Sequence, residues 1–170
     1  MKKLSIFGLL FVSLFIITAC EPKSTEEVSG ETIDTSKMVH QKCIREGEVT
    51  DGEAQLQYDI YYTGDVLNLV RASEKVISSS EDVLNTYEEA YRNIHASYKG
   101  IKYYDTEVIR EDDSVASIMI INYDKVDVNK IISIEGDKDN IFEDGQAKVK
   151  KWTKLAKKVG TKCIDVKEES

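Results

Sequence analysis

Alternating apolar and polar residues over 54–62, AQLQYDIYY, are the feature that most constrains how this chain can fold. Successive side chains of a strand point to opposite faces of a sheet, so this segment has one apolar and one polar face. The residues on the apolar face are Ala54, Leu56, Tyr58, Ile60 and Tyr62. A strand that buries one face and leaves the other in water is typical of an antiparallel sheet.

The residues on both sides of this strand predict tight turns. TDG at 50–52 precedes it and TGD at 63–65 follows it, and Asp with Gly favours a turn. Strand-like patterns lie beyond both turns, at 39–48 and 66–77. Three strands joined in this way form an antiparallel meander.

The apolar period then changes to that of a helix at residues 78–100. The apolar stripe, spaced by three and four residues, consists of Leu84, Tyr87, Tyr91, Ile94 and Tyr98. A second amphipathic helix is expected at about 146–159, after a short one at 128–134 and an irregular segment at 135–145.

Three more strands complete the pattern. Two are expected at about 103–110 and 114–123, where the turn EDDS joins them into a hairpin, and a terminal strand is expected at 162–166. The sequence therefore predicts one α+β domain over residues 39–170. Its antiparallel sheet, meander plus hairpin, has two main helices packed on one face.

The first 20 residues have the pattern of a secretory leader. Two lysines precede an apolar run from Leu4 to Ile17, which is shorter than the roughly 20 residues that span a membrane. The exit, ITAC at 17–20, resembles the lipobox of bacterial lipoproteins. The resemblance implies a signal peptide over 1–20, cleaved before Cys20, and a covalent acyl lipid on Cys20 as membrane anchor. An uncleaved anchor or a secreted protein with an unmodified cysteine is the alternative.

The segment after the leader predicts a flexible tether over residues 21–38, because it has few large apolar residues and no periodicity. The net charge of −8 becomes −10 once the two lysines leave with the leader. Such acidity argues against nucleic acid as a partner. We expect a protein anchored by lipid to the extracytoplasmic face of the cell membrane, with an envelope protein as candidate partner.

The remaining cysteines form an even pair in an oxidising compartment, once Cys20 is assigned to the lipid. Cys43 and Cys163 lie near the two ends of the expected domain. A redox pair or metal site is the alternative, but the sequence has no CxxC motif and only His40 lies near Cys43. We predict a structural disulfide between Cys43 and Cys163.

Motifs for catalysis are missing from the sequence: it contains no hydrolase elbow, zinc helix, phosphate loop or dinucleotide fingerprint. We therefore expect no enzyme, no catalytic residue and no cofactor besides the lipid. One acidic loop at 135–145 has the oxygen ligands for weak calcium binding, with a solvated loop as the alternative. Its candidate ligands are Asp137, Asp139, Asn140, Glu143 and Asp144.

Two other patterns point to surfaces. Nine tyrosines are present, and exposed tyrosines serve recognition, although tyrosine also suits ordinary strands. We expect Tyr61 and Tyr104 to be exposed and to form a candidate binding surface. The last helix carries six lysines around a stripe that includes Trp152. It could lie on anionic lipid, but we expect the stripe to pack on the sheet and the lysines to balance acidic neighbours.

The segment at 97–131 resembles the YehR-type family of small bacterial lipoproteins. The matching residues are Tyr98, Lys99, Ile101, Ile121, Asn122, Tyr123, Lys125 and Asp127. The resemblance implies a lipobox, a short meander, a helix, a hairpin and a C-terminal amphipathic helix. The family is described as of unknown function, so the resemblance implies no catalytic residue.

These patterns lead to one functional hypothesis and one alternative. The hypothesis is a non-catalytic binding or scaffolding module at the cell envelope. The alternative is a small-ligand-binding accessory subunit of an envelope transporter or sensor. A mature chain of 150 residues is small for a two-lobed solute receptor, which favours the first.

Overall fold

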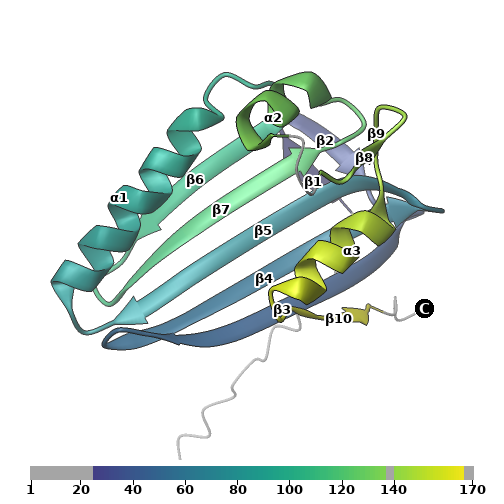
Figure 1. Ribbon diagram of the computed structural model, residues 1–170. Helices are drawn as coiled ribbons and strands as arrows, with labels where there is room; N and C mark the ends of the chain where they lie inside the picture. Colours follow the sequence, from purple (N-terminus) through teal and green to yellow (C-terminus); the bar gives the residue numbers. More distant parts are fainter. Residues whose placement is uncertain (1–24, 137–139, 167–170) are drawn as a thin grey trace, which may run out of the picture.

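A computed structural model of the chain describes residues 25–136 and 140–166 (Figure 1). Within them, helices and strands follow the order β1 (Thr25–Val28), β2 (Glu31–Asp34), β3 (Val39–Val49), β4 (Gly52–Thr63), β5 (Val66–Ser78), α1 (Glu81–Ser97), β6 (Tyr104–Arg110), β7 (Ser114–Asn122), α2 (Val128–Glu135), β8 (Phe142–Glu143), β9 (Gln146–Ala147), α3 (Val149–Lys158) and β10 (Lys162–Asp165).

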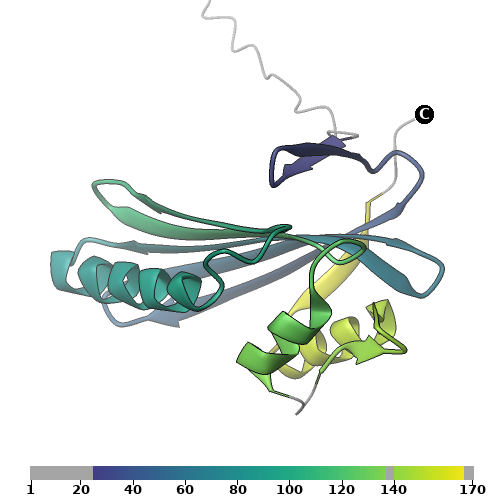
Figure 2. The ribbon, with the colours of Figure 1, turned by 90° about the horizontal axis from the view of Figure 1, so that it is seen from above.

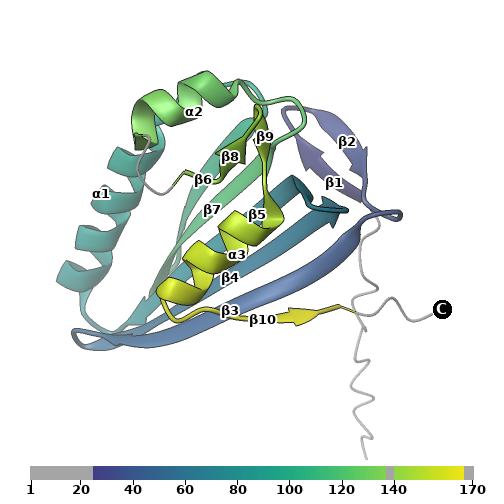
Figure 3. The same cartoon turned by 45° about the vertical axis from the view of Figure 1, so that its right-hand side comes forward.

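Six strands form one antiparallel sheet in the order β10-β3-β4-β5-β7-β6. The predicted meander is β3-β4-β5, and the predicted hairpin is β6-β7, which joins the sheet beside β5. All three helices lie on one face of the sheet, with α1 over one end and α3 over the other (Figures 1 and 3). The expected α+β class is therefore confirmed.

The core lies between this helix-covered face and the helices. The alternation in β4 places Ile60 (0% exposed) and Leu56 (8% exposed) on that face. Tyr58 on the same face packs edge-on against Trp152 of α3, with 5.0 Å between ring centroids. The stripe of α1 buries Leu84 and Tyr91, while Ile94 stays exposed. Burial of one stripe per helix holds these amphipathic elements in place.

The chain between α2 and α3 departs from the sequence-based expectation. Residues 142–147 form the two-stranded hairpin β8-β9 where an irregular segment and the start of a helix were predicted. Asp144 and Gly145 both have positive φ (51° and 74°), as a two-residue hairpin turn requires. Helix α3 therefore begins at Val149 rather than at Gln146.

The N-terminal segment also differs, because residues 25–34 form the hairpin β1-β2 and not part of a flexible tether. Ser29 and Gly30 make its turn with φ values of 52° and 75°. The hairpin lies on the face of the sheet opposite the helices (Figure 2), and Val28 is fully buried there. Ser29 donates hydrogen bonds from its backbone N–H and its Oγ to the Asp105 carboxylate of β6. The tether prediction is therefore wrong for residues 25–34, and residues 21–24 lie outside the described range.

A disulfide joins β10, near the C-terminal end of the domain's sequence, to the neighbouring strand β3, near its N-terminal end. Strand β10 pairs with β3 so that Cys163 lies opposite Cys43, and their sulfurs are 2.08 Å apart. Cys43 is fully buried. No helix within the described residues has the length and apolar character needed to cross a membrane.

Candidate functional site

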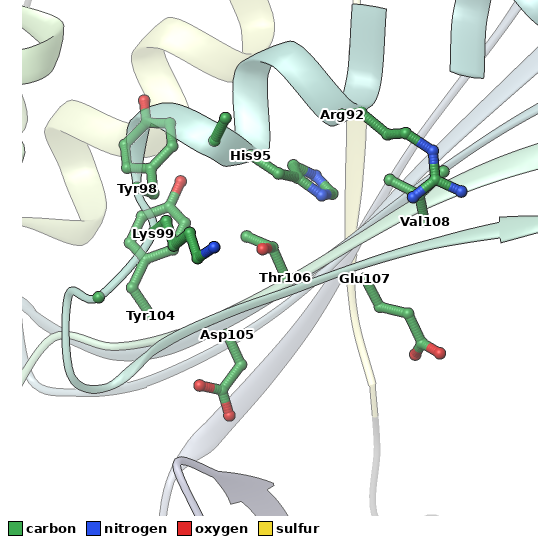
Figure 4. A pocket seen from close by; sticks show the side chains of 11 residues that line it. Arg92, His95, Tyr98, Lys99, Tyr104, Asp105, Thr106, Glu107 and Val108 are labelled. Atoms are coloured by element: carbon green, nitrogen blue, oxygen red, sulfur yellow. The ribbon is translucent and has the colours of Figure 1, made fainter. Parts of the chain in front are cut away.

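A pocket of about 530 Å³ opens between the C-terminal half of α1 and β6, the last strand at one edge of the sheet (Figure 4). We call it the edge pocket. It is lined by Arg92, His95, Ala96, Tyr98, Lys99, Gly100, Tyr104, Asp105, Thr106, Glu107 and Val108.

Secondary-structure geometry explains which of these side chains point inward. Arg92 and His95 are spaced by three residues, which places them on one side of α1, and Lys99 lies in the turn that follows the helix. Along β6, Thr106 points into the pocket, whereas Asp105 and Glu107 point away (Figure 4). The inward groups are therefore cationic or neutral, and the two acids of β6 contribute mainly backbone.

One end of the pocket is a stacked pair of tyrosines. The rings of Tyr98 and Tyr104 are 4.3 Å apart and nearly parallel, with an angle of 7° between them. Burial, with a smaller effect from Glu135, raises the pKa of Tyr98 to about 12, and burial also raises the pKa of Tyr104. Tyr98 donates a hydrogen bond to Glu135 (3.1 Å). Both phenols are neutral at pH 7, so this wall is uncharged.

The tyrosine surface expected from the sequence is not formed. Tyr104 is only 6% exposed, because it points to the helix-covered face and stacks on Tyr98. Tyr61 is also 6% exposed, although it lies on the opposite face. It stacks on His40 with 4.4 Å between ring centroids, and burial followed by the nearby Glu26 of β1 raises its pKa. The prediction that both tyrosines are exposed is wrong, in Tyr61's case because the β1-β2 hairpin covers a face that the alternation assigned to water.

The positive charge of the edge pocket comes from Arg92 of α1 and from Lys99 in the turn after this helix. Arg92 is held by Glu88, one turn earlier, through contacts of 3.0 and 2.7 Å to the same carboxylate oxygen. Lys99 is exposed and makes no ion pair with any described residue. Lys99 is therefore the group best able to attract an anion into the pocket.

Beside the pocket, His95 and Ser117 form a contact that sequence reasoning missed. His95 Nε2 is 2.9 Å from Ser117 Oγ of β7, which joins a helix and a strand 22 residues apart. A histidine beside a hydroxyl can activate a nucleophile when a third group orients the ring. Among described residues, no carboxylate contacts the His95 ring to orient it. Ser117 is not among the residues that line the pocket. The contact therefore fixes the His95 ring at the pocket wall.

His95 leads to a prediction about pH. Burial, with a smaller effect from Arg92, lowers the pKa of His95 below the usual histidine value of about 6.5. The unfolded chain then binds more protons in acid, so stability falls as the pH decreases below about 6.5. The free energy of unfolding should drop more between pH 7 and pH 5 in the wild type than in His95→Gln. Equal losses in the two proteins would contradict the lowered pKa, which NMR titration of the ring measures directly.

The remaining predicted site residues are not brought together in the described part of the chain. Asn140 accepts a hydrogen bond from the Phe142 N–H (3.0 Å), and Glu143 pairs with Lys151 (3.5 Å). Among described residues, no three His, Cys, Asp or Glu side chains are placed to hold a metal. Asp137, Asp139 and the lipidation residue Cys20 lie outside these residues, so the calcium and lipid assignments stay predictions.

This fold, an antiparallel sheet with helices on one face, has a solved counterpart. The NMR structure of the YehR protein of E. coli matches 78% of this chain and 95% of its own, with a TM-score of 0.58 and 17% sequence identity. The chain therefore has a YehR-like fold.

The other comparisons add little to this result. An NMR structure of a protein from Streptococcus pneumoniae TIGR4 has 15% identity and a TM-score of 0.46, and it covers 96% of this chain and 97% of that one. No family model and no curated protein matches the chain.

Proposed function

We propose that this protein is an extracytoplasmic bacterial lipoprotein of the YehR type that binds an envelope protein without catalysing a reaction. A lipid on Cys20 would hold it at the membrane. The observation that carries the binding role is the edge pocket, which lies beside the edge strand β6.

The position of β6 at the edge of the sheet favours a protein segment as the ligand. Strand β6 pairs with β7 on one side and is the last strand of its sheet. An extended segment of a partner can add a strand to such an edge, where backbone hydrogen bonds provide affinity and pockets provide specificity. The Asp105, Glu107 and Arg110 side chains reduce indiscriminate pairing at this edge, because charged edge strands resist aggregation.

The positive charge of the edge pocket favours a partner segment that carries an acidic group. Arg92 comes from α1 and Lys99 from the turn after it, whereas the carboxylates of Asp105 and Glu107 point away from the pocket (Figure 4). An aspartate or glutamate side chain, or a C-terminal carboxylate, would find a cation on one side and the β6 backbone on the other.

Photo-crosslinking in intact cells tests this proposal. A photoreactive amino acid at position 107, exposed on β6, should capture one recurrent protein. The same amino acid at position 89, exposed on α1, serves as the control. Lys99→Glu should abolish the cross-link, whereas Lys130→Glu, the same charge change on α2, should leave it intact.

The membrane anchor is tested in the same cells. Cys20→Ser should prevent labelling by a palmitate analogue and remove the recurrent cross-link, because the domain would no longer be held beside its neighbour. Equal capture from positions 107 and 89, or palmitate labelling that persists in Cys20→Ser, would contradict the proposal.

The size of the pocket supports a second candidate, a small carboxylate-bearing ligand. About 530 Å³ lies within the range of small-molecule sites, which is roughly 300–1,000 Å³. In that case the purified protein should gain thermal stability from an anionic metabolite, and Lys99→Gln should remove the gain. This outcome would identify a ligand-binding accessory subunit.

A further inference from the structure

A second pocket, of about 610 Å³, lies on the same face of the sheet as the edge pocket but beside a different helix, between α3 and the β4-β5 turn. We call it the lysine pocket. It is lined by Gln41, Tyr62, Gly64, Val149, Lys150, Thr153, Lys154 and Lys157. Helix α3 runs across this end of the sheet in Figure 3, close to β3 and β4.

The lysines of this pocket form a row along one side of α3. Lys150, Lys154 and Lys157 are spaced by four and three residues, so they share one helix face. At 1.5 Å per residue, the row extends for about 10 Å. All three side chains are exposed at the pocket, and its inner part contains the buried Val149 and the half-buried Tyr62.

These three lysines differ from Lys148 and Lys151, which have acidic partners among the described residues. Lys148 pairs with Asp65 (3.6 Å) and Lys151 pairs with Glu143 (3.5 Å), as expected for lysines that balance acidic neighbours. Within the described range, Lys150, Lys154 and Lys157 form no ion pair. Asp165 is already bound by the amide of Gln41 (2.9 Å). A chain with a net charge of −8 therefore keeps three uncompensated cations in one pocket.

We infer that the lysine pocket binds two or more phosphate groups at once, on one soluble anion or on neighbouring headgroups. Three ammonium groups in a row attract several negative charges at once. Lysine acts as a compact point charge that suits phosphate oxygens, whereas planar carboxylates are usually held by the two-pronged guanidinium of arginine, which this lining lacks. The inference is independent of the edge pocket, which lies beneath a different helix.

Such phosphate groups can come from a soluble oligophosphate or from phospholipid headgroups. Helix α3, which supplies the three lysines, lies on the face of the sheet opposite the β1-β2 hairpin, where the described chain begins (Figure 2). The two sources are distinguished by titrating the full chain, purified from membranes in a neutral detergent, with two probes. One is inorganic tripolyphosphate, followed by calorimetry. The other is phosphatidylglycerol added to the micelles, with phosphatidylcholine as its uncharged control.

The test uses a matched pair of variants. In the first, Lys150→Gln, Lys154→Gln and Lys157→Gln are combined, and binding should weaken by about tenfold or more. In the second, Lys37→Gln, Lys42→Gln and Lys130→Gln remove the same charge outside the lysine pocket and should change binding less than twofold. Arginine at the three pocket positions keeps the charge and should retain binding.

Each outcome has a defined meaning. Loss of tripolyphosphate binding in the first variant alone supports a soluble ligand, and loss of phosphatidylglycerol binding in that variant alone supports a lipid headgroup. Failure of both probes to bind at millimolar concentration would overturn the inference. Equal weakening in both variants, or equally tight binding of citrate, would also overturn it.

Discussion

Removing the Cys43–Cys163 disulfide is expected to lower the free energy of unfolding by about 4–5 kcal/mol. The bond closes a loop of 120 residues, so its loss frees nearly the whole domain in the unfolded state. It also removes the covalent link between β3 and the four-residue edge strand β10. The variant Cys43→Ala/Cys163→Ala is compared with the wild type by denaturant unfolding, followed by circular dichroism.

The control for this prediction is the redox state of the solvent. With a strong reductant present, the wild type should unfold at nearly the same denaturant concentration as the double variant. Cys20→Ala alone, under oxidising conditions, should leave the midpoint unchanged. Similar midpoints for oxidised wild type and double variant would show that the bond does not restrict the unfolded chain.

Leu69→Ala is expected to cost about 2–5 kcal/mol of stability, the usual range for a buried leucine. Leu69 is fully buried, yet it lies opposite Tyr61 and Asn122 on the face of the sheet away from the helices. A single-layer sheet would leave this face in water. Its burial shows that the β1-β2 hairpin is part of the folded domain.

A residue on the same face provides the matched control. Ile109 of β6 is 37% exposed, and Ile109→Ala should cost less than about 1 kcal/mol because little apolar surface is lost from the interior. Thermal and denaturant unfolding of both variants measure the difference. If the two substitutions cost the same, the hairpin does not cover Leu69 in solution.

Local patterns were enough to predict most elements of the main sheet. The alternation around Ile60 and the helical stripe around Leu84 both reflect one buried face, which a strand or helix shows in its own sequence. The start of α2 also has a local cause, because the carboxylate of its N-cap residue Asp127 accepts the Asn129 N–H at 3.1 Å. The two missed hairpins had local signals as well, in the turn pairs Ser29-Gly30 and Asp144-Gly145.

The candidate sites were much less predictable. The edge pocket brings together Lys99, from the turn after α1, and Thr106 of β6, and no spacing within either segment indicates the other. The lysine row of α3 was visible in the sequence, but not which lysines have acidic partners. Lys151 meets Glu143 through the β8-β9 hairpin, whereas Lys154 lines a pocket with Gln41 of β3.

The sequence by itself determined the α+β class, the order of the main strands and helices, and the expectation of a lipid-bearing Cys20, because each depends on residues close together in the chain. Tertiary structure alone decided that the hairpin of residues 25–34 covers Tyr61 and Leu69, and which cations around the two pockets form no ion pair with a described residue. These features depend on contacts between distant segments. Burial and charge pairing are properties of a side chain's neighbours in space, which the periodicity of one segment does not encode.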